Sequence, residues 1–133
     1  MKKNGQKKMI EILDTNVLVR FLIRDNEKQY KQAVCWFKEA EKGKRKIMIE
    51  PLVIAETCFV LESFYKKERI EIAEKMETFL SQRWLKVVDR KIMYSLWKWY
   101  KKNYHFVDSF LIAWTKVNKS RVLSFDKDLQ KMI

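Results

Sequence analysis

The residues EILDTNVLVRFL, at positions 11–22, contain the transition between secondary-structure types on which the expected fold depends. An apolar approach ends at Asp14-Thr15-Asn16, and a second apolar run follows at once. Asp, Thr and Asn favour the first positions of helices, so this stretch predicts a strand that turns directly into a helix. Asp14 is then either a helix cap or one part of a charged site.

The same alternation continues along the chain. Short apolar runs predict strands and amphipathic stretches predict helices, and strands that alternate with helices form parallel β-α units. Right-handed crossovers place helices on both faces of a small parallel sheet, so we expect an α/β fold in which ligands bind at the carboxyl ends of the strands. The expected strands are residues 9–13, 47–49, 85–88 and 121–125, and the expected helices are residues 17–23, 27–41, 51–65, 70–80, 91–102, 107–117 and 126–132.

Composition favours one domain and a polyanionic partner. The chain has 133 residues, 47% of them hydrophobic, and no apolar run approaches the length of a membrane span. We expect a flexible basic arm or an appended extension at residues 1–8, followed by a domain at 9–133. There are 29 Lys and Arg against 17 Asp and Glu, a formal net charge of +12. Such a charge suits nucleic acid, although lysines spread over solvated faces would give the same value.

The two cysteines indicate the redox state of the compartment in which the protein is expected to work. Cys35 and Cys58 have apolar neighbours and no metal-ligand spacing. We expect two buried free thiols in a reducing compartment, which favours the cytoplasm. A disulfide or a metal role is the minority alternative.

Acidic residues follow two of the predicted strands. Asp14 comes after the first strand, and Asp126 and Asp128 come after the last. The carboxyl ends of parallel strands meet at one edge of a sheet, so these carboxylates are expected there if the strands are close. Each carboxylate taken alone is also a good candidate for a helix cap.

Two further acids share helix faces with apolar residues. Glu56 shares a face with Phe59 and Val60, and Asp108 shares one with Leu111. A carboxylate on an apolar face is costly unless it is paired or binds metal, although a lysine partner for Glu56 and a capping role for Asp108 are the simpler readings. Clustered carboxylates need a cation, and oxygen ligands without His or Cys favour Mg²⁺ or Mn²⁺, which support phosphodiester hydrolysis.

Four segments carry a family pattern in order: LDTNVLVRFL (13–22), IEPLVIAETCFVL (49–61), FVDSFLIAW (106–114) and VLSFDKDL (122–129). Together they resemble PIN-domain proteins, specifically the single-domain toxin ribonucleases of VapBC toxin–antitoxin pairs. The resemblance implies an αβα sandwich around a short parallel sheet, with an acidic metal site at its carboxyl edge.

Site residues follow from the resemblance position by position. It implies four catalytic acids, three of which would bind the metal while Glu56 orients or deprotonates the attacking water or binds a second ion. It also implies polar residues that support the site, among them a serine where members typically have threonine. Ser109 and Trp114 stand where members often have alanine and a small residue. The four acids are Asp14, Glu56, Asp108 and Asp126, the metal ligands are Asp14, Asp108 and Asp126, and the supporting residues are Asn16, Thr15, Ser124 and Asp128.

The resemblance also implies activity and partners. It implies a Mg²⁺- or Mn²⁺-dependent endoribonuclease that leaves 5′-phosphate and 3′-hydroxyl ends. The protein would be a homodimer inhibited by a VapB-like antitoxin in a groove walled by residues 17–37. The alternative is a catalytically silent RNA- or protein-binding module of the same fold. A dehalogenase-type phosphatase is disfavoured because it needs a second Asp where Asn16 stands.

One basic, aromatic stretch is a candidate RNA surface. Residues 96–106, LWKWYKKNYHF, interleave aromatic side chains with lysines, which suits stacking on unpaired bases and contact with phosphates. The simpler reading is a half-buried helix with solvated lysines, in which at least one aromatic residue stays exposed because both faces cannot be core. His105 is expected to be a surface loop residue. The candidate RNA contacts are Lys98, Lys101, Lys102 and, from the loop at 42–46, Arg45.

Overall fold

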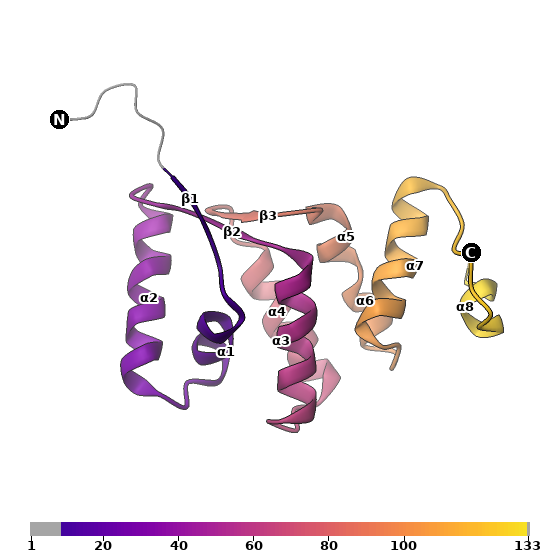
Figure 1. Cartoon of the computed structure of the whole chain (residues 1–133), viewed down its shortest axis with the longest axis horizontal. Helices are drawn as coiled ribbons and strands as arrows, with labels where there is room; N and C mark the ends of the chain where they lie inside the picture. Colours follow the sequence, from indigo (N-terminus) through magenta and orange to yellow (C-terminus); the bar gives the residue numbers. More distant parts are fainter. Residues whose placement is uncertain (1–8, 133) are drawn as a thin grey trace.

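Three short parallel strands form the sheet of the computed structural model, which describes residues 9–132 (Figure 1). Strand β1 (Ile10–Ile12) pairs with β2 (Lys46–Ile49), and β2 pairs with β3 (Leu85–Val87), so the strand order is β1-β2-β3. The register places Ile12 beside Met48. This parallel sheet with its connecting helices confirms the α/β class, and the expected arm at residues 1–8 lies outside the described residues.

In the view of Figure 1, most of the connecting helices lie below the strands of the sheet. Helix α1 packs against both α2 and α3, and α7 packs against α3, α5 and α6. The sheet residues that face the core are Ile47, Ile49, Leu85 and Val87, all buried. The helices are α1 (Thr15–Ile23), α2 (Glu27–Glu41), α3 (Pro51–Ser63), α4 (Arg69–Leu80), α5 (Arg90–Ser95), α6 (Trp97–Tyr100), α7 (Phe106–Asn118) and α8 (Lys127–Lys131).

Local signals explain most helix boundaries. Helix α2 covers the predicted range of 27–41, and its N-cap Asn26 accepts a hydrogen bond from the backbone N–H of Gln29 at 3.1 Å. Pro51 occupies the first turn of α3, where its missing N–H is not needed. Arg24 ends α1 in the left-handed conformation.

The predicted single helix at 91–102 is wrong, because the chain forms two short helices that meet at Leu96. The interruption at Leu96 separates the two short helices, and side chains from both of them reach the core. Trp97, Trp99 and Tyr100 are therefore buried, and Tyr94 is the exposed aromatic residue. The expectation that one aromatic side chain would be exposed is confirmed.

The predicted strand at 121–125 is also wrong, since this segment has no regular structure. Helix α7 ends at Lys119 in the left-handed conformation, and the chain then runs to α8, which lies beyond α7 from β1 (Figure 1). Leu123 and Phe125 are fully exposed, whereas Leu129 of α8 is buried. The five residues RVLSF contain only three apolar side chains, too few to form a strand without a neighbouring sheet edge.

The cysteine prediction holds in part. Both cysteines are free thiols, and Cys58 is buried, but Cys35 is exposed on α2. Its apolar neighbours in the sequence point to the core from other sides of the helix.

Within residues 9–132, the helices are all too short or too polar to span a membrane.

Candidate active site

Asp14 stands at the point where β1 gives way to α1, with its side chain exposed. Its backbone carbonyl accepts hydrogen bonds from Val17 N at 3.1 Å and Leu18 N at 3.4 Å, so the residue caps the helix with its main chain. Its carboxylate makes no capping hydrogen bond. The two readings of Asp14 are therefore compatible, because the side chain is left available for another ligand.

Two acids that the sequence argument did not single out occupy equivalent positions after the other strands. Glu50 caps α3 directly after β2, and Asp89 caps α5 two residues after β3. Neither carboxylate makes a side-chain capping hydrogen bond. Neighbouring strands lie about 4.8 Å apart, so Asp14, Glu50 and Asp89 form a row along the carboxyl edge of the sheet. Their position directly after apolar runs is the signal that could have identified them.

Glu56 lies on α3 with its side chain exposed, and the argument that placed it on a buried apolar face is wrong. Phe59 and Phe64 on the same face are 64% and 74% exposed, so that face borders solvent instead of the core. Helix α3 nevertheless packs against both α1 and α7, which carry Asp14 and Asp108. Glu56 therefore lies on the helix that contacts the elements of the other two candidate residues, Asp14 and Asp108.

Asp108 is half-buried in the first turn of α7, two residues inside the helix. The N-cap is His105, so a capping role for Asp108 is wrong. Ser109, its neighbour, is buried and donates from Oγ to the His105 carbonyl at 2.9 Å. The carboxylate of Asp108 lies in the first turn of α7, at the positive end of the helix dipole.

Asp126 caps α8 with its side chain. Its Oδ1 accepts hydrogen bonds from Asp128 N at 2.9 Å and Leu129 N at 3.3 Å, and its own N–H donates to Ser124 Oγ at 2.9 Å. Because the strand before it is absent, the argument that put Asp126 at the sheet edge fails, and α8 lies apart from β1 (Figure 1). Asp128 and Ser124 belong to this same capping turn.

In the described residues, the candidate acids do not converge into a set of metal ligands. Across residues 9–132, no three His, Cys, Asp or Glu side chains come close enough together to hold an ion. The donor chemistry is that of a hard cation, since the candidate ligands are carboxylates without His or Cys. The structure brings Asp14, Glu56 and Asp108 onto neighbouring helices and leaves Asp126 and Asp128 outside that group.

Three hollows lie around the first two helices. A hollow of about 480 Å³ runs along β1 and is lined by Asp14, Val17, Trp36 and Arg45 among others. A smaller one of about 140 Å³ shares Val17 and Trp36 with it. The largest, about 600 Å³, lies between α1, α2 and α4. Asp14 is therefore reached from a surface depression that continues onto the outer side of α1 and α2.

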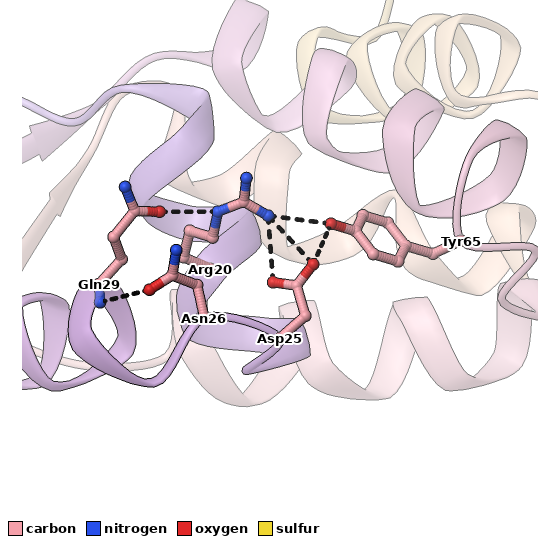
Figure 2. A network of polar contacts seen from close by, with 5 residues as sticks. All are labelled: Arg20, Asp25, Asn26, Gln29 and Tyr65. Carbon is pink, nitrogen blue, oxygen red and sulfur yellow. Dashed lines mark hydrogen bonds and ion pairs between the residues drawn. The ribbon is translucent and has the colours of Figure 1, made fainter.

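A polar network fixes the far end of α1 (Figure 2). The guanidinium of Arg20 donates to both oxygens of Asp25 at 3.0 and 3.1 Å, to Tyr65 Oη at 3.0 Å and to Gln29 Oε1 at 2.8 Å. Tyr65 in turn donates to Asp25 at 2.6 Å. The hydrogen bond from Tyr65, together with Arg20, lowers the pKa of Asp25. The network joins α1 and α2 to the segment after α3.

A second network holds the start of α7, and its residues were missed or misjudged from the sequence. Arg69 donates from Nη1 to the Tyr104 carbonyl at 2.6 Å and from Nε to Glu62 at 3.3 Å, and its Nη2 lies 3.0 Å from Nδ1 of His105. Glu62, which the sequence patterns did not mark as a site residue, also accepts from the buried Tyr100 hydroxyl. Burial raises the pKa of Tyr100, so this hydroxyl keeps its proton.

The basic side chains predicted to contact RNA differ in their contacts within the protein. Lys101 pairs with Glu77 at 2.9 Å, and Arg45 pairs with Glu11 at 2.8 Å and Glu39 at 3.0 Å. Lys98 lies 4.6 Å from the centre of the Trp99 ring. Within residues 9–132, Lys102 has no ion-pair partner and is exposed.

Comparisons with known proteins give the family. A family model described as PIN domain matches residues 12–133. The VapC ribonuclease of Aquifex aeolicus (strain VF5) is 30% identical over 125 residues, which cover 92% of each chain. No solved structure matches significantly. The order of strands and helices, the acid directly after β1 and these two matches lead to one conclusion: the chain belongs to the PIN-domain family and is VapC-like.

Proposed function

We propose that this protein is a Mg²⁺- or Mn²⁺-dependent endoribonuclease that acts as the toxin of a type II toxin–antitoxin pair. The observation that carries the proposal is its 30% identity, over 92% of the chain, to a protein named VapC ribonuclease. The exposed Asp14 carboxylate after β1, which makes no capping hydrogen bond, supports it from the structure. The net charge of +12 suits an RNA substrate.

The proposed reaction is attack of water on a phosphodiester. The P–O3′ bond breaks, the water oxygen stays on phosphorus, and the products are a 5′-phosphate and a 3′-hydroxyl. A carboxylate takes a proton from the attacking water, and the leaving 3′-oxygen receives one from solvent. Asp14, Glu56 and Asp108 are our candidates for these roles because Asp14 caps α1, Asp108 lies on α7, and α3, which carries Glu56, packs against both of these helices.

Metal dependence is part of the proposal and rests on donor chemistry. Oxygen ligands from carboxylates suit Mg²⁺ and Mn²⁺, and a bound ion of this kind neutralises charge on a scissile phosphate. Asp126 caps α8, which lies apart from β1 (Figure 1), and this position argues against that residue as a ligand. Calorimetric titration of the protein with Mn²⁺, compared with the Asp14→Asn and Asp126→Ser variants, identifies the ligands without reliance on activity.

We further propose that the largest hollow receives an apolar segment of a VapB-like antitoxin. Its walls include the aromatic rings of Phe21, Phe37, Phe79 and Trp84, and its lining also includes two lysines and two glutamates, Lys38, Lys75, Glu41 and Glu74. Aromatic pockets of this type are typical anchors in protein interfaces. A homodimer in the cytoplasm completes the proposal, and light scattering on the purified protein measures its oligomeric state.

The test of the proposed function is cleavage of labelled RNA by the purified protein in the presence of Mn²⁺. We expect cleavage that stops on addition of EDTA and is absent in Asp14→Asn. A catalytically silent module of the same fold, the second candidate, would bind the RNA without cleaving it. The absence of both binding and cleavage for several structured and unstructured RNAs would reject the two candidates together.

A further inference from the structure

We propose that the small hollow between α1 and α2 binds one unpaired nucleobase of the RNA substrate, beside the phosphate to be cleaved. This inference deepens the proposed function and rests on it. We name the site the Trp36 hollow, and its lining residues are Asn16, Val17, Arg20, Gln29, Gln32 and Trp36.

The shape of the Trp36 hollow fits a flat ring. Its volume is about 140 Å³, which suits one nucleobase and leaves no room for a peptide helix. The indole of Trp36 is half-buried against the core and therefore held in place, and Val17 is half-buried opposite the exposed rim. A fixed aromatic face is the surface on which single-stranded nucleic acids stack their bases.

The rim of the Trp36 hollow carries three carboxamides. Asn16, Gln29 and Gln32 are exposed, and an amide offers a donor and an acceptor side by side, the pattern of a base edge. Within the described residues no hydrogen bond occupies the side chains of Asn16 and Gln32. These two amides are therefore available to a ligand.

Arg20 stiffens the floor of the hollow. It donates to Gln29 Oε1 at 2.8 Å, which leaves the amide N–H groups of Gln29 free to donate outward (Figure 2). Its Nη1 group donates to both Asp25 and Tyr65, so its charge is already paired with a carboxylate. We assign Arg20 the role of a positioning residue that holds Gln29, and no phosphate contact.

Continuity with the acidic edge is what links this hollow to the reaction. The neighbouring hollow along β1 shares Val17 and Trp36 with it and is also lined by Asp14. A base stacked on Trp36 thus places its backbone toward the Asp14 carboxylate. In a duplex, base faces and pairing edges are covered, so the site selects unpaired nucleotides such as those in loops.

The experiment compares cleavage of RNA hairpins whose loops carry every base at the positions flanking the cut. We expect Trp36→Ala to raise KM about 10-fold or more with kcat nearly kept, and Trp36→Phe to retain most of the affinity, since stacking on an aromatic ring is worth about 1–3 kcal/mol per base. We expect Gln32→Ala to change which bases flank the cut. Tyr94→Ala, an exposed aromatic residue on α5, is the matched control and should leave both readouts unchanged.

The outcomes separate this inference from the proposed function. If the wild type cleaves and neither Trp36→Ala nor Gln32→Ala alters KM or the base preference, the inference is overturned. If no RNA is cleaved, binding of four single-base oligonucleotides decides instead, and dependence of that binding on Trp36 supports the hollow while the enzyme proposal fails. Because Gln32 is exposed, its variant tests the site even if loss of the Trp36 indole impairs folding.

Discussion

Arg69 and His105 are 36 residues apart in sequence, and the Arg69 guanidinium lies 3.0 Å from Nδ1 of the imidazole. Arginine can only donate, so Nδ1 must be the acceptor and the proton of the neutral ring must lie on Nε2. The same guanidinium donates to the Tyr104 carbonyl at 2.6 Å. One side chain on α4 therefore fixes the entry into α7, three residues before Asp108.

The first prediction concerns this contact. Arg69 is only 16% exposed, so Arg69→Met should remove the cation paired with Glu62 and the charged donor to the Tyr104 carbonyl, and lower the free energy of unfolding by about 2–3 kcal/mol. Arg69→Lys should recover only part of this loss, because an ammonium cannot reach three acceptors in a planar fork. Urea unfolding measures both variants, with Arg83→Met, an exposed arginine, as the control. Equal stability of all three variants would contradict this role.

The second prediction concerns the two thiols. Burial raises the pKa of Cys58 well above its usual range, so it stays a protonated thiol through neutral and mildly alkaline pH. Cys35 is exposed. We expect a thiol reagent at pH 8 to label one cysteine rapidly and the second only on unfolding, and peptide mapping should place the fast label on Cys35. Rapid labelling of Cys58 would contradict its burial.

The same buried groups predict a pH dependence of stability. The folded pKa values of Cys58 and Tyr100 are raised, mainly by burial, so the folded state keeps protons that the unfolded chain releases. Their contribution is complete below the unfolded pKa values and is lost progressively as the pH rises above about 9–10 toward the raised folded values. Thermal unfolding between pH 7 and 11 should show this decline, and Cys58→Ala should flatten its first part.

The elements that the sequence predicted well are those with a local signal. The helix at 27–41 has an amphipathic pattern and an Asn26 cap that closes its first turn, so its bounds follow from nearby residues. The strand at 121–125 has neither, because a short apolar run depends on a sheet edge elsewhere in the chain. Leu96 shows a third case, in which tertiary packing of Trp97 and Tyr100 breaks a helix that periodicity alone would continue.

The candidate site was predictable at the end of β1, and the prediction failed where it depended on burial or on the strand at 121–125. Asp14 follows β1 as predicted, since an apolar run that ends in a capping residue is a local feature. The importance given to Glu56 assumed that Phe59 lies in the core, and Phe59 is exposed. Glu62 was not a candidate, yet it pairs with Arg69 and accepts a hydrogen bond from Tyr100, 38 residues away in sequence. Hydrogen bonds between side chains of different helices produce no repeating pattern in the sequence from which they could be predicted.

The next prediction tests the carboxylate row at the sheet edge. Asp14→Asn should lower kcat for RNA cleavage by about 100-fold or more, because the amide can neither take a proton nor carry a negative charge. Asp89 is the control residue: it is exposed and caps α5 after β3, as Asp14 caps α1 after β1, but it is not part of the family pattern. Asp89→Asn should therefore leave kcat within a few-fold of the wild type. A comparable loss in both variants would point to a general electrostatic effect instead of a specific role for Asp14.

The last prediction separates the two roles open to Asp126. Its carboxylate accepts hydrogen bonds from Asp128 N and Leu129 N, so Asp126→Ala should destabilise α8 by about 1 kcal/mol. Serine also caps helices well, so Asp126→Ser should restore that stability while it removes the carboxylate. Because α8 lies apart from β1, we expect the serine variant to cleave RNA within a few-fold of the wild type (Figure 1). If Asp126→Ser instead folds normally and loses cleavage, the segment after α7 must approach Asp14 in the active protein.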